Sequence, residues 1–129
     1  VKSNADPWPR AFDGLMSVGP AGYTRIGPAL RHASGELGRA RARKRLLLVV
    51  TDGRPTDYDR YEGRYGVEDV RMAVREAHDL GVAVFALAID AQARAHLAEM
   101  FGRGRYAVLA KPEGLVDAMA AVYRDVLVR

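Results

Sequence analysis

The chain has 129 residues, 49% of them hydrophobic and 28% charged, with a net charge of +4 at pH 7. This length suits one domain or part of one, and the composition excludes both a disordered chain and a membrane-embedded one. Because the chain has no cysteine, disulfides, thiolate catalysis and cysteine-based metal sites are excluded as well. No apolar run approaches the roughly 20 residues that span a bilayer, so we expect a cytoplasmic protein without membrane insertion.

The first part of the chain predicts an irregular segment followed by a helix. Residues 1–23 are rich in proline and glycine, which indicates loops, with a short helix expected over Arg10–Met16. Thr24 is a good N-cap for the next helix, and Pro28 falls in its first turn, where the missing N–H costs little. Apolar residues then follow helical spacing at Ile26, Leu30, Ala33 and Leu37.

A run of basic residues follows this helix. Five cations lie between Arg39 and Arg45, and Arg31 precedes them. Cations at a helix end are favoured by the helix dipole, and the alternative interpretation is a docking surface for an acidic partner. Nucleic acid is not expected as a partner because no aromatic residue is interleaved with the run.

The remaining residues alternate between apolar strands and amphipathic helices. The continuous apolar run Leu46–Val50 predicts a central strand buried on both faces. After a polar loop over 52–66, we expect a helix over 67–80, a strand over 82–89, a helix over 92–101, a strand over 105–109 and a helix over 112–128.

This alternation predicts an α/β fold of Rossmann-like type, with a parallel sheet covered by helices on both faces. Three strands are few for such a fold. We therefore expect that N-terminal strands are missing from this chain, or that another chain supplies them by pairing with the exposed sheet edge.

Polar residues gather at one edge of the predicted sheet. Asp52 ends the first strand, Asp90 ends the second, and Thr24 opens a helix. In open parallel sheets, ligands bind beyond the carboxyl ends of the strands. Carboxylate and hydroxyl oxygens are hard donors that suit Mg²⁺. Taken alone, these residues are also typical of ordinary caps and turns.

Longer stretches carry a family resemblance. Residues 24–33 (TRIGPALRHA), the strand-end sequence Thr51-Asp52-Gly53 and residues 61–66 (YEGRYG) resemble the von Willebrand factor A domains of the nitric-oxide-reductase activation D protein and of the adaptor subunit of a bacterial rubisco activase. The resemblance covers about Trp8 to Tyr123. It identifies residues 1–129 as the C-terminal portion of a von Willebrand A-like domain.

The resemblance implies a metal-ion-dependent adhesion site built from three loops. It assigns the threonine ligand to Thr24 and the aspartate ligand to Asp52, with one position of the cation left open for a carboxylate of the partner protein. The family's remaining motif, Asp-x-Ser-x-Ser, does not occur in the 129 residues. Two ligands should hold Mg²⁺ poorly, so we expect weak or absent Mg²⁺ binding unless the missing half is supplied.

The resemblance also implies a protein-binding function without enzymatic activity. Such domains belong to adaptors that work with a MoxR-type AAA+ ATPase on a client enzyme such as nitric oxide reductase or rubisco. Two alternatives remain open, a Mg²⁺-dependent phosphotransfer-type enzyme that uses Asp52 or Asp90, and a metal-free structural interaction module. The expected partner-binding residues are Arg25, Arg54, Asp57, Tyr58, Asp59, Tyr61, Glu62 and Tyr65.

Overall fold

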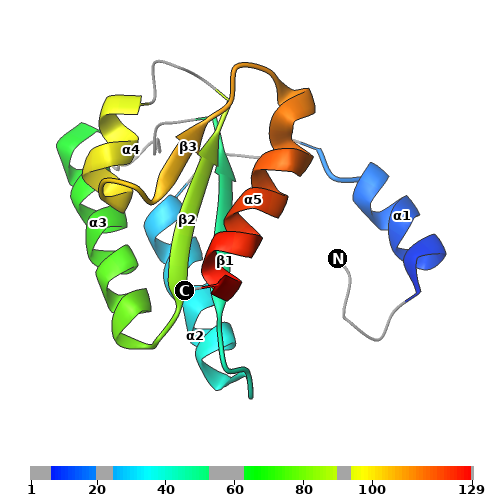
Figure 1. The fold of residues 1–129 in the computed structure, drawn as a ribbon, viewed down its shortest axis with the longest axis horizontal. Coiled ribbons are helices and arrows are strands. Elements are labelled where there is room, and N and C mark those ends of the chain that lie inside the picture. Colours follow the sequence, from blue (N-terminus) through cyan, green and yellow to red (C-terminus); the bar gives the residue numbers. More distant parts are fainter. Residues whose placement is uncertain (1–6, 20–24, 53–62, 90–93, 129) are drawn as a thin grey trace.

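The computed structural model describes residues 7–19, 25–52, 63–89 and 94–128 (Figure 1). Helices and strands alternate after the first helix. In chain order they are α1 (Trp8–Met16), α2 (Ile26–Arg39), β1 (Leu46–Thr51), α3 (Gly63–Asp79), β2 (Ala83–Ala88), α4 (Arg94–Phe101), β3 (Tyr106–Val108), the 3-10 turn η2 (Pro112–Gly114) and α5 (Leu115–Val128).

The three strands form one parallel sheet in the order β1-β2-β3. β1 pairs with β2 along its whole length, from Leu46 opposite Ala83 to Thr51 opposite Ala88. β3 is shorter and pairs only with the second half of β2. The predicted parallel α/β fold is therefore confirmed. The burial predicted for Leu46–Val50 is wrong, because β1 lies at the sheet edge here: its first four residues are half-buried and Val50 is 49% exposed.

Helices cover both faces of the sheet (Figure 1). On one face, the alternate residues of β2 pack with residues of α2, α3 and α4 into the hydrophobic core. On the other face, α5 packs against β1 and β2. This arrangement follows from strand geometry, since successive side chains point to opposite faces. Helix α1 lies apart from the sheet in Figure 1, and its side chain Phe12 is 57% exposed.

The predicted starts of α2 and α3 are wrong. Helix α2 starts at Ile26 with Arg25 as N-cap, and the Arg25 carbonyl accepts the first helical hydrogen bond, from the Ala29 amide. The N-cap is therefore not Thr24, which lies outside the described residues. Helix α3 starts at Gly63, four residues before the predicted start, so the expected loop up to residue 66 is shorter. The buried stripe of α3 begins at Gly66, which has no side chain to reveal it in a hydrophobic pattern.

An ion-pair network joins α2 to α3. Arg31 of α2 forms salt bridges of 2.7 Å to Asp69 and 2.6 Å to Glu76, both on α3. The hydrogen bond to Glu76 raises the pKa of the Arg31 guanidinium above its usual range, and the bond to Asp69 adds to this effect. Ser34, on the same helix as Arg31, is buried and donates a hydrogen bond of 2.6 Å to the Leu30 carbonyl within α2. Arg31 thus holds two helices together and is not part of the basic run.

Candidate functional site

The carboxyl ends of all three strands meet at one edge of the sheet. Thr51 lies opposite Ala88, and Ala88 lies opposite Val108. The ladder continues one step further, since the Leu109 amide donates to the Ala88 carbonyl at 2.7 Å and the Ile89 amide donates to the Thr51 carbonyl at 3.4 Å. This edge, which we call the carboxyl edge, is where a parallel sheet offers its loops to ligands.

Asp52 lies at the carboxyl edge, in a bend directly after β1. Asp52 is exposed among the described residues. An exposed carboxylate held at the end of a rigid strand can accept hydrogen bonds or coordinate a hard cation. The predicted placement of Asp52 at a strand end is confirmed.

The N-terminus of α2 reaches the same edge. Arg25, its exposed N-cap residue, and Thr51, the last residue of β1, both line a hollow of about 290 Å³ between α2 and β1. We call it the α2–β1 hollow. The rest of its lining is apolar and consists of Ile26, Ala29, Leu30, Ala33, Leu47, Leu48, Val49 and Val50. Arg25 and Thr51 therefore line one common cavity.

The other predicted site residues fall into two groups. Tyr65 is described and stands in the first turn of α3, where it is 66% exposed. The remaining members lie outside the described residues. They are Thr24, Arg54, Asp57, Tyr58, Asp59, Tyr61, Glu62 and Asp90.

The side chains that could act as metal ligands can be compared with the needs of the expected Mg²⁺. Among the residues that the structure describes, no three acidic or histidine side chains gather in one place. Asp52 has the right chemistry for Mg²⁺ at the carboxyl edge, because it is an exposed carboxylate directly after Thr51, the last residue of β1. Since Mg²⁺ takes six oxygens and keeps several waters, Asp52 fits as one ligand of a cation whose other protein ligands must come from elsewhere.

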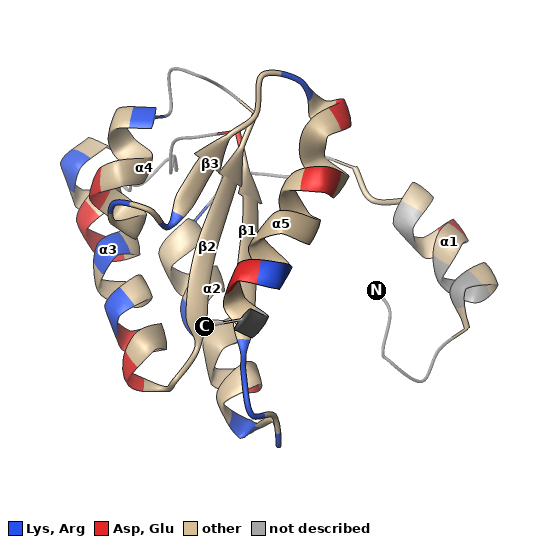
Figure 2. Ribbon diagram, viewed as in Figure 1, with Lys and Arg blue, Asp and Glu red and all other residues tan. Residues whose placement is uncertain are grey.

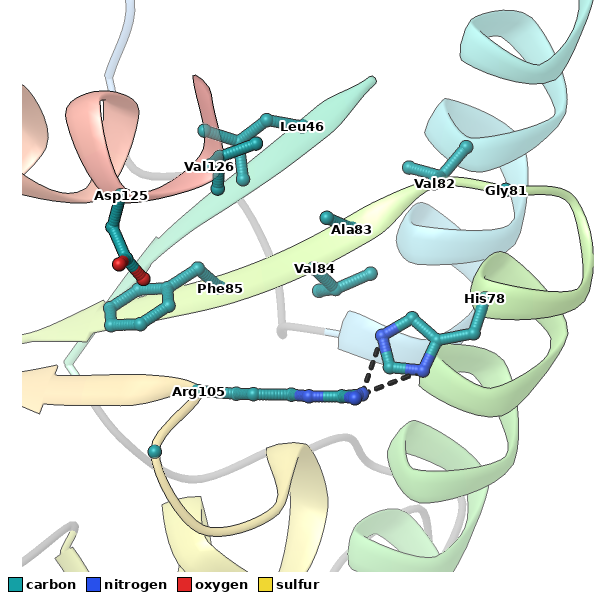
Figure 3. Close-up of a pocket in the computed structure, with 11 residues that line it drawn as sticks. Leu46, His78, Gly81, Val82, Ala83, Val84, Phe85, Arg105, Asp125 and Val126 are labelled. Atoms are coloured by element: carbon teal, nitrogen blue, oxygen red, sulfur yellow. Dashed lines mark hydrogen bonds between the residues drawn. The ribbon is translucent and has the colours of Figure 1, made fainter. Parts of the chain in front are cut away.

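Sequence reasoning missed a polar cluster at the opposite edge, where the strands begin (Figure 3). Nη1 of Arg105 lies 2.6 Å from Nδ1 and 2.7 Å from Nε2 of His78. Burial lowers the pKa of His78, the Arg105 cation lowers it further, and Asp79 opposes them. Both residues line a hollow of about 380 Å³, with Asp125 of α5 on its rim. Residues 27 positions apart carry no spacing signal that could have paired them.

No helix within the described ranges is long and apolar enough to cross a bilayer.

Comparison with a family model and comparison with individual proteins point to the same family. The family model of the von Willebrand factor type A domain matches residues 10–117. The protein NorD of Brucella suis is 48% identical over 110 residues, which cover 85% of this chain and 17% of that protein. NorD of Stutzerimonas stutzeri is 46% identical over 99 residues, covering 77% of this chain and 16% of that protein.

An uncharacterised protein of Pseudomonas aeruginosa is 42% identical over 110 residues, with 85% of this chain and 18% of that protein covered. The chain thus spans less than a fifth of the length of these relatives. The matched region includes the parallel sheet, the carboxyl edge and the α2–β1 hollow. From its fold and from this match, the chain belongs to the von Willebrand factor type A domain family.

Proposed function

We propose that this domain binds a client protein through a metal-ion-dependent adhesion site at the carboxyl edge. The observation that carries the proposal is the exposed Asp52 at the end of β1, on the edge that the N-terminus of α2 also reaches. In the proposed site, Asp52 supplies a carboxylate and Thr24 a hydroxyl to Mg²⁺. A carboxylate of the client completes the coordination, so that the metal joins the two proteins.

The proposed site is incomplete within this chain. Two protein ligands leave most of the cation's positions to water, so Mg²⁺ binding by the chain itself should be weak. An Asp-x-Ser-x-Ser motif from outside this sequence would supply the remaining hydroxyl and carboxylate oxygens.

The client would also contact the residues around the metal. Tyr65 supports this part of the proposal, because it is a large, exposed aromatic side chain in the first turn of α3. Tyrosine and arginine are enriched among the residues that dominate binding energy at interfaces. Arg25 is the described arginine that flanks the edge, and Arg54 with the acidic and aromatic residues 57–62 is proposed to complete the surface.

The larger assembly is proposed on the family resemblance. We propose an adaptor role in the cytoplasm, in which a MoxR-type AAA+ ATPase supplies the force and this domain holds the client. Nitric oxide reductase and rubisco are the two clients that the resemblance implies, and the relatives named NorD make nitric oxide reductase the client tested first. A phosphotransfer site usually needs neighbouring carboxylates together with a lysine or general acid, and lysine occurs in this sequence only at positions 2, 44 and 111, which favours the binding role in this proposal.

The test replaces Asp52 and measures client capture. Asp52→Ala should lower the binding of immobilised nitric oxide reductase at high Mg²⁺ at least about tenfold, as for loss of a desolvated interface contact, and EDTA should lower wild-type binding equally. Asp79→Ala, which removes an exposed carboxylate at the end of α3, is the matched control and should bind normally. Equal binding by all three proteins would support the structural-module alternative. A turnover by the purified chain that Asp52→Ala abolishes would support the enzyme.

A further inference from the structure

The edge of the sheet where the strands begin carries the basic run of the sequence. The connection from α2 to β1 covers residues 40–45 and includes Arg41, Arg43, Lys44 and Arg45. Figure 2 shows it as a stretch rich in basic residues at the lower end of the sheet. We call this connection the basic connection. It lies at the opposite end of β1 from Asp52, about 20 Å away at the rise of a strand.

Two of its cations hold the connection in place. The Arg45 guanidinium donates to the Ala40 carbonyl at 3.2 and 3.0 Å and to the Leu80 carbonyl at 3.5 Å. Lys44 Nζ donates to the Val126 carbonyl of α5 at 2.8 Å. These bonds tie the segment to its own start, to the end of α3 and to α5, so its shape is fixed by backbone acceptors.

Arg41 and Arg43 have a different role. Both are exposed, and neither has a hydrogen-bond or ion-pair partner among the residues that the structure describes. The preceding cation, Arg39, is bound to Glu36 within α2. Arg41 and Arg43 thus remain available to an external anion on a segment that the other cations have already ordered.

An apolar hollow lies beneath the basic connection. It measures about 310 Å³ and is lined by Leu37, Leu46, Tyr123 and Val126 together with the alanines and the last two cations of the connection. No acidic side chain is among its lining residues in the described part of the chain. Tyr123 is 59% exposed at its rim. We call it the Tyr123 hollow.

The combination of hollow and cations selects one kind of partner. We infer that the basic connection and the Tyr123 hollow together bind an acidic protein segment that inserts one apolar side chain. The hollow buries the apolar anchor, which contributes through the hydrophobic effect, while Arg41 and Arg43 pair with flanking carboxylates and steer the approach. A single-stranded nucleic acid would use several stacking aromatics, and among the described residues that line this hollow Tyr123 is the one aromatic.

This second interface goes beyond the proposed client site and does not depend on it. The two surfaces lie at opposite ends of β1 and share no residue. A domain with both could hold a client at one end and an acidic segment of another protein at the other.

The test measures binding of labelled probes to the 129-residue chain by fluorescence anisotropy. The first probe is a peptide of glutamates with one central leucine, the second has glutamine in place of that leucine, and the third has lysines in place of the glutamates. A single-stranded DNA of equal charge is the fourth. We expect the first probe to bind most tightly, with an affinity that falls as salt is added.

Charge reversal then locates the site. The double variant Arg41→Glu with Arg43→Glu should weaken binding of the first probe at least about tenfold, because two attractive contacts with the glutamates of the probe become repulsive. Tyr123→Ser should remove the preference for leucine over glutamine and leave the salt dependence. The matched control is Arg71→Glu with Arg75→Glu on the exposed face of α3, which changes the net charge equally and should bind as wild type. Circular dichroism of each variant confirms that the fold is kept.

Three results would overturn the inference. If the control variant Arg71→Glu with Arg75→Glu weakened binding of the first probe equally, net charge alone would drive binding. Tighter binding of the DNA would point to a nucleic-acid surface instead. No binding of the first probe by the folded wild-type chain would mean that the hollow accepts no such segment. Because none of these readouts uses Mg²⁺ or Asp52, a failure here is distinct from a failure of the client site.

Discussion

At the scale of single residues, Arg31 of α2 links its helix to α3 through ion pairs. It binds two carboxylates of α3 at once, and one of them, Asp69, is only 19% exposed. Removing the guanidinium would therefore take one ion pair away from a partly buried carboxylate. Such networks contribute more than isolated surface pairs, because one ordered side chain serves two partners.

We predict that Arg31→Ala lowers the free energy of unfolding by about 1 kcal/mol. The measurement is urea denaturation of wild type and variant. Arg71→Ala is the matched control, since Arg71 pairs with Glu68 inside α3 and such exposed pairs within one helix contribute about 0.3–0.5 kcal/mol. If both variants lost the same stability, the link between the two helices would contribute nothing of its own.

His78 gives the molecule a pH dependence at the edge where the strands begin. Its pKa is lowered by burial and by Arg105, with Asp79 opposing and Asp125 lining the same hollow. Because the folded-state pKa lies below the unfolded one, the unfolded chain binds the proton more tightly. The contribution of neutral His78 to the free energy of unfolding is complete above the ordinary histidine pKa, and it is lost as the pH falls below that value.

We therefore predict that the melting temperature falls between pH 7 and pH 5, and that His78→Gln reduces this fall. Thermal melts at a series of pH values provide the measurement. His32→Gln is the control, because His32 is an exposed histidine on α2, and it should leave the pH profile unchanged. A profile for His78→Gln that superimposes on wild type would remove His78 from this explanation.

At the scale of elements, the end of α3 shows how a helix is terminated by backbone geometry. Gly81 has φ of +72°, its amide donates to the His78 carbonyl at 2.8 Å, and the Val82 amide donates to the Ala77 carbonyl at 2.9 Å. This is the Schellman arrangement, in which a left-handed residue lets two amides satisfy the last carbonyls of the helix. It turns the chain directly from α3 into β2.

We predict that Gly81→Ala destabilises the protein by about 1 kcal/mol, because an alanine side chain opposes the left-handed conformation. A Cβ there would meet only Arg45 at 3.5 Å, so the cost is conformational and not steric. Gly35→Ala, inside α2 with nothing within 4 Å of its new Cβ, should instead stabilise by about 0.5–1 kcal/mol. Chemical denaturation of both variants checks the opposite signs.

Some helices and strands can be predicted from the sequence more fully than others. The apolar runs of β1 and β2 predict the strands, since few other structures accommodate them. The start of α3 could not be predicted, because its first buried residue is Gly66. Ser34 is equally hidden, since a buried serine that satisfies its hydroxyl on the Leu30 carbonyl breaks the apolar pattern of α2.

At the scale of the whole molecule, the candidate site was predictable in outline only. Parallel strands bring their carboxyl ends to one edge whatever the loops contain, so Asp52 could be placed there from its position after an apolar run. The Arg31 network and the contact between His78 and Arg105 join residues far apart in sequence, and only the packed structure brings them together. The α2–β1 hollow likewise arises from the packing of two elements and has no local signature.

The position of β1 between the two proposed interfaces has a mechanical consequence. If one partner holds the Asp52 end and another holds the Lys44 end, a pull between them runs along the strand axis. Because both partners would hold the same strand, the covalent backbone of β1 would carry the tension from end to end. The hydrogen bonds from Leu46–Ala83 to Thr51–Ala88 join β1 sideways to β2 and would not have to break. In the proposed adaptor, that geometry would let the domain transmit a pull while its sheet remains intact.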